Sequence, residues 1–509
     1  MLIRVFSGAV IGIDAYPVEV EVDIARGLPY YTTVGLAEVS VKESRDRVKA
    51  AIVNSGFLFP DDHITVNLAP ANIKKSGTGF DLPVALGILA ATGVFPPETL
   101  AGYLVLGELS LDGRVRPVGG VLSVTMAARQ GGYRGVIVPD ENRAEAAVVD
   151  GVAVYAFSNL AQVVGFFDGS LTVSPARLDC RRIFEQDRGG AEDYAEVAGQ
   201  EHAKRALEIA AAGGHNILMT GPPGSGKTML ARRLPTILPD LTFDEAMEVT
   251  RIYSVAAKLD QGRALITQRS FRNPHHTISD AGLIGGGGNP RPGEVSLAHH
   301  GVLFLDELPE FRKSILEMLR QPLEDKKVTI SRAAVAITYP SSFMLVAAMN
   351  PCPCGFFNDP RHECLCAPQQ ISRYRARISG PLLDRIDLHV DVPAVAFREM
   401  AGEIRSESSA NIKARVVRAR SLQEKRFAGA KIFCNAAMTS RHIRQCCRTE
   451  ADAAGLLETA IDRLGMSARA YNRILKVART IADLAGDDSL RIDHVAEAIQ
   501  LRGLDRKPV

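Results

Sequence analysis

The sequence NILMT at 216–220, followed by GPPGSGKT at 221–228 and MLARRL at 229–234, decides the fold of the central part of the chain. Its middle segment fits G-x-x-x-x-G-K-[ST], and an apolar strand before it and a helix after it are the context of a phosphate-binding loop. Glycines let backbone N–H groups close around phosphates, and the positive end of the helix faces them. We therefore expect an α/β domain that binds ATP through Gly221, Pro222, Pro223, Gly224, Ser225, Gly226, Lys227 and Thr228. In this pattern Lys227 reaches the β- and γ-phosphates and Thr228 binds Mg²⁺.

Two further apolar segments end in polar residues that suit ATP hydrolysis. The segment VLFL at 302–305 runs into Asp306 and Glu307, and the segment 343–349 runs into Asn350. Two adjacent carboxylates after a buried strand are costly without a cation, so we assign Mg²⁺ binding to Asp306. Glu307 is then expected to polarise the attacking water, with Asn350 helping to position it beside the γ-phosphate.

The length of 509 residues corresponds to about three domains at roughly 150 residues each. Residues 1–170 alternate β-rich runs with helical stretches and predict a mixed α/β domain. Residues 171–195 have the composition of a linker, 196–395 form the nucleotide-binding core, and 396–509 show helical spacing of apolar residues typical of a lid. The fold class is therefore α/β and multidomain.

Composition excludes several classes of protein. Hydrophobic residues make up 46% of the chain and charged residues 23%, which excludes an intrinsically disordered protein. The longest nearly apolar stretch, 82–95, is too short for a bilayer span, and the N-terminus lacks the pattern of a secretory signal. Eight cysteines in so long a chain do not predict a disulfide framework, so we expect a cytoplasmic protein with no membrane partner.

The net charge of +2 conceals a basic region. Residues 411–479 contain 15 Lys or Arg and five Asp or Glu, a local net charge of +10. Such a region is the electrostatic pattern of a nucleic-acid partner, and it is equally compatible with a solvated helical face balanced by acids elsewhere in the fold.

Four of the cysteines lie within fifteen residues, and these are Cys352, Cys354, Cys364 and Cys366. Four thiolates complete a tetrahedral zinc shell, which leaves no open position and therefore favours structural over catalytic zinc. The C-x-C spacing is tighter than the usual C-x₂₋₄-C, so reduced, partly buried thiols are the alternative.

The segment from Lys326 to Thr338 has the pattern of a β-hairpin with Arg332 near its tip. We hypothesise that Arg332, with Lys326 and Lys327, contacts DNA phosphate; solvated hairpin charges are the alternative. The paired His275 and His276 have no carboxylate nearby in the sequence and favour a structural turn over a metal site.

The motifs DYAEVAGQEHAKRAL (193–207), GVLFLDELPEF (301–311) and SGPLLDRIDLHV (379–390) together resemble an AAA+ ATPase of the magnesium-chelatase-like, helix-2-insert branch. The resemblance implies a ring, usually hexameric, in which Arg385 is the arginine finger that reaches the neighbouring subunit's nucleotide. It also makes Arg469 the sensor 2 arginine over the γ-phosphate. A capping or salt-bridged arginine is the alternative for Arg385.

The N-terminal region resembles the proteolytic domain of Lon and the related domain of the recombination factor RadA. The resemblance lies in SGTGFDLPVALGILA (76–90), LGELSLDGRVRPVGG (106–120) and AARQGGYRGVIVP (127–139). At the two catalytic positions this chain has Gly77 and Val124, which supply neither a hydroxyl nor a base. We therefore expect a binding or assembly platform and not a protease.

The whole-chain order, with NPCPCG (350–355) after the sensor 1 strand, resembles the ComM/YifB family of bacterial proteins. That resemblance implies a homohexameric, ATP-driven DNA translocase or helicase that promotes branch migration during integration of single-stranded DNA in natural transformation. DNA and recombination proteins are the implied partners. A remodelling ATPase acting on a protein and a nucleotide-dependent scaffold are the rival functions, while Glu307, Asn350 and Arg385 favour real hydrolysis over a scaffold.

Overall fold

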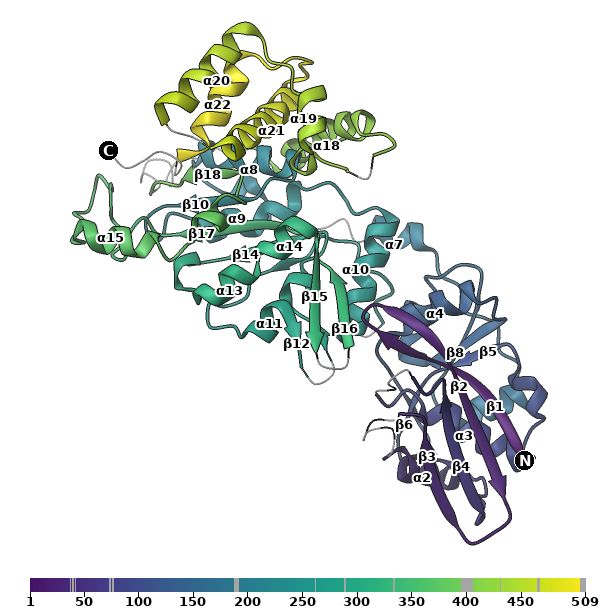
Figure 1. The fold of residues 1–509 in the computed structure, drawn as a ribbon. Coiled ribbons are helices and arrows are strands. Elements are labelled where there is room, and N and C mark those ends of the chain that lie inside the picture. The colour runs from purple at the N-terminus through teal and green to yellow at the C-terminus, as the bar shows by residue number, and fades with distance from the viewer. Residues whose placement is uncertain are drawn as a thin grey trace.

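The computed structural model describes residues 1–503 apart from 37, 39–40, 42, 73–74, 76, 187–191, 261, 288–289, 333–334, 395–405, 431 and 465–466. The chain forms three consecutive bodies, an N-terminal α/β domain, a central α/β domain and a helical C-terminal domain (Figure 1). The predicted α/β multidomain class is confirmed. None of the helices in the described part of the chain combines the length and apolar character that a bilayer span requires.

A seven-stranded mixed sheet forms the N-terminal domain, with strand order β3-β4-β2-β1-β5-β8-β9. The strands are β1 (Leu2–Ile11), β2 (Asp14–Ala25), β3 (Tyr30–Val34), β4 (His63–Ala69), β5 (Tyr103–Val105), β8 (Gly135–Pro139) and β9 (Ala153–Phe157), with a small β6 (Glu108–Leu109) and β7 (Val115–Arg116) pair outside the sheet. The helices are α2 (Ser44–Asn54), α3 (Asp81–Ala91), α4 (Val121–Gln130), α5 (Arg143–Ala146) and α6 (Leu160–Phe167). Helix α3 is apolar all round and buried from Asp81 to Ala90, so it serves as the core element of this domain.

The central domain is built on a five-stranded parallel sheet with order β11-β14-β17-β10-β18. Its strands are β10 (Ile217–Thr220), β11 (Phe271–Arg272), β14 (Val302–Leu305), β17 (Met344–Met349) and β18 (Leu388–Asp391). Two hairpins project from the domain, β12 (Gly285–Gly286) with β13 (Arg291–Pro292) and β15 (Lys327–Arg332) with β16 (Val335–Pro340). The helices are α8 (Glu201–Gly213), α9 (Lys227–Ile237), α10 (Phe243–Val255), α11 (Asp280–Ile284), α12 (Glu294–Leu297), α13 (Lys313–Met318), α14 (Arg320–Asp325), α15 (Pro368–Arg375) and α16 (Gly380–Leu383).

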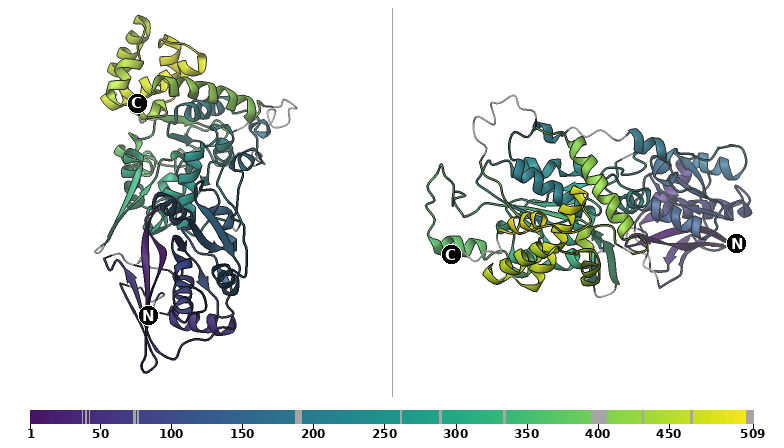
Figure 2. Two further views of the ribbon diagram at one scale, coloured as in Figure 1. Left: turned by 90° about the vertical axis from the view of Figure 1, so that its right-hand side faces the viewer. Right: turned by 90° about the horizontal axis from the view of Figure 1, so that it is seen from above.

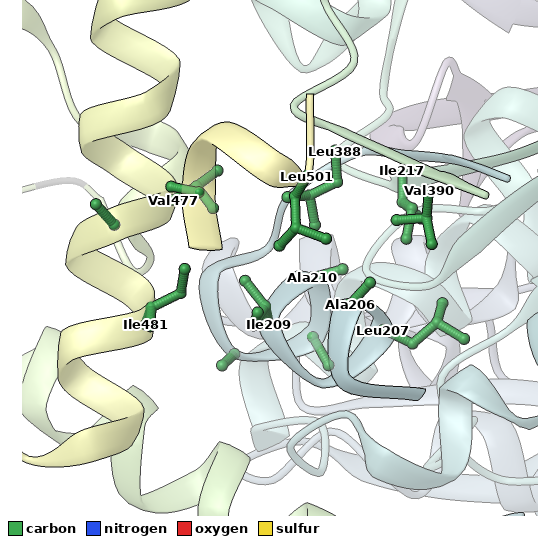
Figure 3. Packing of buried hydrophobic residues seen from close by; sticks show 14 of the residues in the cluster. Ala206, Leu207, Ile209, Ala210, Ile217, Leu388, Val390, Val477, Ile481 and Leu501 are labelled. Atoms are coloured by element: carbon green, nitrogen blue, oxygen red, sulfur yellow. The ribbon is translucent and has the colours of Figure 1, made fainter. Parts of the chain in front are cut away.

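The C-terminal domain consists of α18 (Ser409–Arg426), α19 (Ser440–Cys446), α20 (Ala451–Leu464), α21 (Ala468–Ala485) and α22 (Ile492–Gln500). Figure 3 shows how it docks: Val477 and Ile481 of α21 and Leu501 meet Ile209 and Ala210 of α8. The same apolar cluster continues into the parallel sheet through Ile217, Leu388 and Val390. Because the cluster crosses the domain boundary, the lid and the sheet share one core.

The segment expected as a linker is packed against both domains that it joins. It contains α7 (Cys180–Gln186), and Cys180, Ile183 and Phe184 pack against an apolar cluster that combines residues of α4 and α10. Further on, Tyr194 is fully buried and donates a hydrogen bond from its hydroxyl to the Leu230 carbonyl at 2.9 Å. The N-terminal and central domains are therefore bridged by buried side chains and not joined by a tether alone.

Candidate nucleotide-binding site

The phosphate-binding loop connects the carboxyl end of β10 to the first turn of α9. Gly224 and Gly226 adopt positive φ angles of 73° and 90°. Gly221 has no room for a side chain, because a Cβ there would lie 2.0 Å from the carbonyl oxygen of Val392. These glycines let the loop curl around the amino end of α9, where backbone N–H groups and the helix dipole favour an anion.

Lys227 places its amine inside the curl of this loop. Its Nζ donates to the carbonyls of Gly221 at 2.7 Å and Pro222 at 2.9 Å, and it lies 3.4 Å from Oδ1 of Asn350. Burial lowers the pKa of Lys227, while the carboxylates of Asp306 and Glu307 oppose that effect. Burial therefore removes water from the Lys227 cation, and a bound anion would stabilise its charge. This is the electrostatic requirement for binding a phosphate.

The two groups predicted to hold Mg²⁺ are in direct contact. Thr228 is in the first turn of α9 and donates from Oγ1 to Oδ2 of Asp306 at 2.7 Å. Asp306 directly follows β14, two strands from β10 in the sheet. A hydroxyl and a carboxylate oxygen are hard ligands of the kind that Mg²⁺ prefers, so the donor set fits the ion.

Glu307 lies at the same edge in an unusual backbone conformation. Its φ is 52°, in the left-handed region, and its backbone N–H donates to Oδ1 of Asp306 at 3.0 Å. A non-glycine residue in this region costs on the order of 1–3 kcal/mol, and such strain clusters at active sites. The carboxylate is about half exposed, as a group that must meet a water molecule and the γ-phosphate has to be.

His276 is a site residue that sequence reasoning missed. Its Nδ1 lies 3.5 Å from Oε2 of Glu307, whereas the sequence around it favours a structural turn with no carboxylate nearby. The signal was available in principle: His276 follows β11, which is the parallel neighbour of β14, and the carboxyl ends of parallel strands lie at one edge of a sheet. The sequence did not reveal that the short segment Phe271–Arg272 is a strand of that sheet.

Arg385 and Arg469 lie together at the opposite end of the sheet. Asn216, just before β10, donates to the carbonyl of Arg385 at 2.9 Å, whereas the phosphate-binding loop follows the other end of that strand. Four residues of β10 separate the two ends by about 13 Å. Within one chain the structure therefore brings together Lys227, Thr228, Asp306, Glu307 and Asn350, and it does not bring either arginine to them.

The two arginines are held by carboxylates at that far edge. The guanidinium of Arg385 is ion-paired with Glu324 of α14 and hydrogen-bonded to the Pro381 carbonyl. Arg469 is exposed and lies 3.5 Å from Asp384, the residue next to Arg385. Both side chains are therefore on one face of the molecule, next to each other in space although 84 residues apart in the chain.

The four cysteines of the C-x-C pairs converge. Cys352 Sγ lies 3.3 Å from Cys354 Sγ and 3.7 Å from Cys364 Sγ, and all four sulfurs lie within 4.8 Å of one another. A tetrahedral zinc shell with Zn–S bonds near 2.3 Å requires sulfurs about 3.8 Å apart, whereas a disulfide requires about 2.05 Å. The arrangement fits a metal and not a disulfide.

The predicted hairpin at 326–338 forms, but its charges are spread along it. Lys327 begins β15 at the base and Arg332 is the last residue of that strand, about 17 Å away at 3.3 Å per residue. Lys326 precedes the strand and lies at the base as well. The three residues proposed to contact DNA are therefore not one cluster, and Arg332 alone is near the tip.

The basic excess in 411–479 is reduced by ion pairing. Six of its basic residues pair with carboxylates that all lie outside the segment: Lys413 with Asp240, Arg415 with Glu208 and Glu407, Arg426 and Arg479 with Asp483, Arg469 with Asp384, and Arg473 with Asp387. Lys431 lies outside the described residues. Exposed basic side chains remain on α18 and α19, among them Arg418, Lys425, Arg441 and Arg444. Balance by carboxylates elsewhere in the fold therefore accounts for a large part of the local positive charge.

The parallel sheet order, the loop before α9 and the two polar strand ends define an AAA+-type P-loop module. Three family models match the chain: magnesium chelatase, subunit ChlI, at residues 193–400; subunit ChlI of Mg-chelatase at 20–142; and the ChlI C-terminal region at 406–502. They cover the central, N-terminal and C-terminal domains in turn.

Relatives of the whole chain place it more narrowly. It is 44% identical to the uncharacterized protein YifB of Escherichia coli K12 over 504 residues, 99% of this chain and 97% of that protein. It is also 44% identical to the competence protein ComM of Haemophilus influenzae over 505 residues, with the same shares of the two chains. The N-terminal similarity to Lon protease 2 of Bacillus subtilis is 32% over 154 residues, 28% of this chain and 26% of that protein. The chain belongs to the ComM/YifB family of magnesium-chelatase-like AAA+ ATPases.

Proposed function

We propose that the protein is a ring-forming, ATP-hydrolysing DNA motor of the cytoplasm, which promotes branch migration while single-stranded DNA is integrated during natural transformation. The observation that carries the ATPase part is the contact between Thr228 and Asp306, with Lys227, Glu307 and Asn350 around it at the carboxyl edge of one sheet. The transformation role is taken from the full-length similarity to a competence protein.

In the proposed reaction the loop N–H groups and Lys227 bind the β- and γ-phosphates. Thr228 and Asp306 would hold Mg²⁺, which would neutralise charge on the phosphates while water attacks the γ-phosphorus and ADP leaves. Glu307 orients and polarises the attacking water with a carboxylate that is about half exposed. The Asn350 amide, 3.4 Å from the Lys227 amine, helps to position that water beside the γ-phosphate.

The two arginines enter the reaction from a neighbouring subunit. Arg385 and Arg469 lie at the far edge of their own sheet, so each chain carries half of two different sites. A heterologous, ring-closing contact that sets this face against the next subunit's phosphate-binding loop completes every site in turn. In that contact the nucleotide's phosphates compete with Glu324 and Asp384 for the two guanidinium groups.

A structural zinc at the four cysteines is the second part of the proposal. The sulfur separations suit tetrahedral coordination, and Gly355 of the same loop packs on the phosphate-binding loop, where a Cβ would lie 2.6 Å from Cδ of Pro223. The expected role is to hold this loop against the nucleotide site. Reduced thiols without metal are the alternative.

A protein-remodelling ATPase is the competing function. It is favoured by the match to magnesium chelatase subunit models and by the ion pairing of much of the 411–479 basic segment. Both functions use the same ATP chemistry, so only the dependence on DNA separates them.

The test measures ATP hydrolysis with and without single-stranded and forked DNA at two salt concentrations, with Glu307→Gln as the inactive control. Salt-sensitive stimulation by DNA followed by strand displacement supports the motor. Hydrolysis that is indifferent to DNA supports the remodelling function instead.

The composite site is tested by mixing two inactive variants, Lys227→Ala and Arg385→Ala. Random mixing in a ring regenerates about a quarter of the interfaces with one intact loop and one intact finger. Activity in the mixture, and none in either variant alone, supports the trans arrangement. An inactive mixture of correctly assembled rings contradicts it.

A further inference from the structure

The hairpin β15–β16 has one buried face and one exposed face. Directly opposed residues share a face, and on one of them Val328, Ile330, Ile337 and Tyr339 are all nearly buried. The other face carries exposed, small residues, which are Thr329, Ser331, Ala336 and Thr338. A hairpin that projects from a domain can bury an apolar face only against something that covers it, so the covering elements fix its position.

One covering element belongs to the central domain itself. At Gly285 of β12, a Cβ would lie 2.7 Å from Cδ1 of Ile330. The hydroxyl of Tyr339 donates to the carbonyl of Pro290, between β12 and β13, at 2.8 Å. The hairpin β15–β16 is thus attached to the β12–β13 hairpin.

The second covering element comes from the N-terminal domain. The tight turn between β1 and β2, residues 11–13, reaches the side of β16 (Figures 1 and 2). Gly12 is in contact with the hairpin, since a Cβ there would lie 3.0 Å from Cγ2 of Ile337 and 3.6 Å from the Thr338 carbonyl oxygen. Ile11 and Ile13 pack against the same apolar cluster that contains Ile330 and Ile337.

This turn is anchored independently of the hairpin. Nη2 of Arg251 on α10 donates to the Ile13 carbonyl at 2.7 Å and to Oδ1 of Asp14 at 2.7 Å. Ser123 of α4 donates to the same Ile13 carbonyl at 2.6 Å. The side chain of Ile13 also packs with Ile252, on the same helix as Arg251.

A second polar connection holds the two domains together beside the turn. Ser254 of α10 accepts from the backbone N–H of Gly120 at 2.9 Å and donates to the buried carboxylate of Glu145. Glu145 in turn accepts from the N–H of Leu122 at 2.9 Å. Arg251 therefore fixes the turn to α10, while the tip of the turn contacts a hairpin whose two strands, among the described residues, pair only with each other.

We propose that the N-terminal domain positions the β15–β16 hairpin, with the β1–β2 turn as a fixed support and Gly12, Ile13 and Arg251 as positioning residues. The turn limits how far the hairpin can move toward the N-terminal domain in the ATP cycle. This gives a role to a domain whose former catalytic positions hold Gly77 and Val124. The coupling to DNA rests on the proposed function, whereas the support of the hairpin by the turn does not.

The test replaces Gly12 by valine and compares it with a matched control. Gly12→Val introduces both backbone strain at φ +67° and overlap with Ile337. Gly56→Val introduces comparable strain at φ +86°, with nothing within 4 Å of the new Cβ position. Both variants are made in the full chain, so the difference between them isolates contact with the hairpin.

Two measurements are made on each variant. Hydrogen exchange of the β15 and β16 amides is expected to become at least about tenfold faster in Gly12→Val and to stay unchanged in Gly56→Val. Basal ATP hydrolysis is expected to stay within about twofold in both, while stimulation by single-stranded DNA is lost in Gly12→Val alone. Arg251→Gln, which removes the anchor without adding volume, is expected to give the same exchange pattern.

The inference is overturned if hairpin exchange is unchanged in both Gly12→Val and Arg251→Gln. It is also overturned if Gly56→Val has the same effect as Gly12→Val, because the cause is then strain in the N-terminal domain. If DNA does not stimulate ATP hydrolysis by the unmodified protein, the proposed motor function is wrong. Hydrogen exchange of the β15 and β16 amides still decides, independently, whether the turn supports the hairpin.

Discussion

Replacement of Asp387 by asparagine is expected to loosen the lid from the ATPase core. Asp387 stands just before β18, and its carboxylate is almost fully buried. One oxygen accepts from Nη1 of Arg473 on α21 at 2.6 Å, and the other lies 3.2 Å from Nδ1 of His215. His215 continues to α21 through Thr480 at 2.8 Å. The carboxylate is therefore a buried polar link between the sheet edge and the lid.

The size of the effect follows from these contacts. Each hydrogen bond to a charged group contributes about 1.5–3 kcal/mol, and removal of one charge from a buried pair costs about 3–5 kcal/mol. The Asp384→Asn variant is the matched control, because Asp384 is three residues away and faces Arg469, whose side chain is 70% exposed, at 3.5 Å. An exposed pair of this kind contributes less than about 1 kcal/mol.

Hydrogen exchange in α21 measures the difference. At about 1.4 kcal/mol per factor of ten, Asp387→Asn is expected to accelerate exchange in α21 by about 100-fold or more, and Asp384→Asn by less than about tenfold. ATP hydrolysis is expected to fall as well, because α21 carries Arg469 in its first turn. The reasoning would be refuted if α21 exchanged at the same rate in the two variants. It would also be refuted if exchange in Asp387→Asn were no faster than in the unmodified protein.

The effect also has a predicted pH dependence. Burial by itself raises the pKa of Asp387, but the hydrogen bond with His215 and the charge of Arg473 outweigh it and hold the pKa well below its usual range. A carboxyl with a depressed pKa stabilises the folded state fully above its unfolded pKa, near 3.9, and loses that contribution as the pH falls further. The difference between Asp387→Asn and the unmodified protein should therefore be constant from about pH 5 to 8 and shrink only below about pH 4.

Three further predictions concern the other sites. Burial raises the pKa of Glu145, although the hydrogen bonds from Ser254 and its other donors oppose that effect, so ionisation of Glu145 destabilises the folded state. As the pH rises from about 4 to 7, the melting temperature of Glu145→Gln should therefore increase relative to that of the unmodified protein. A difference in melting temperature that does not change with pH would contradict this. His276→Ala should lower the rate of ATP hydrolysis at saturating ATP by about tenfold with little change in KM, because His276 lies beside Glu307, which is proposed to act on the attacking water; a change in KM alone would argue against a positioning role. Cys352→Ser should reduce bound zinc, measured by metal analysis, from about one equivalent to near zero, and metal-free unmodified protein would remove the zinc assignment.

Local sequence was sufficient for the ATP-binding half of the site. A phosphate-binding loop and the strand ends at Asp306 and Asn350 are encoded within about eight residues each, so their geometry follows from glycine conformations and strand direction. The fold class and the family followed from the same motifs and are confirmed. The roles of the individual residues stay predictions.

Other features depended on contacts between distant segments. His276 meets Glu307 only because a two-residue strand joins the sheet beside β14, and so short a segment has no readable periodicity. The charge count over 411–479 ignored carboxylates such as Asp240 and Glu208, which lie far away in the sequence and pair with that segment in the fold.

The sequence by itself determined which chemistry the chain carries, because residue types and short spacings fix a phosphate-binding loop and a strand that ends in carboxylates. Only the tertiary structure decided where each of these groups lies relative to the others. Strand direction placed Arg385 and Arg469 at the end of the sheet opposite their own phosphate-binding loop, and domain packing set the β1–β2 turn against the hairpin. The physical reason is that buried contacts form between segments hundreds of residues apart. An apolar face in the sequence shows that the face must be buried, but it does not identify the segment that packs against it.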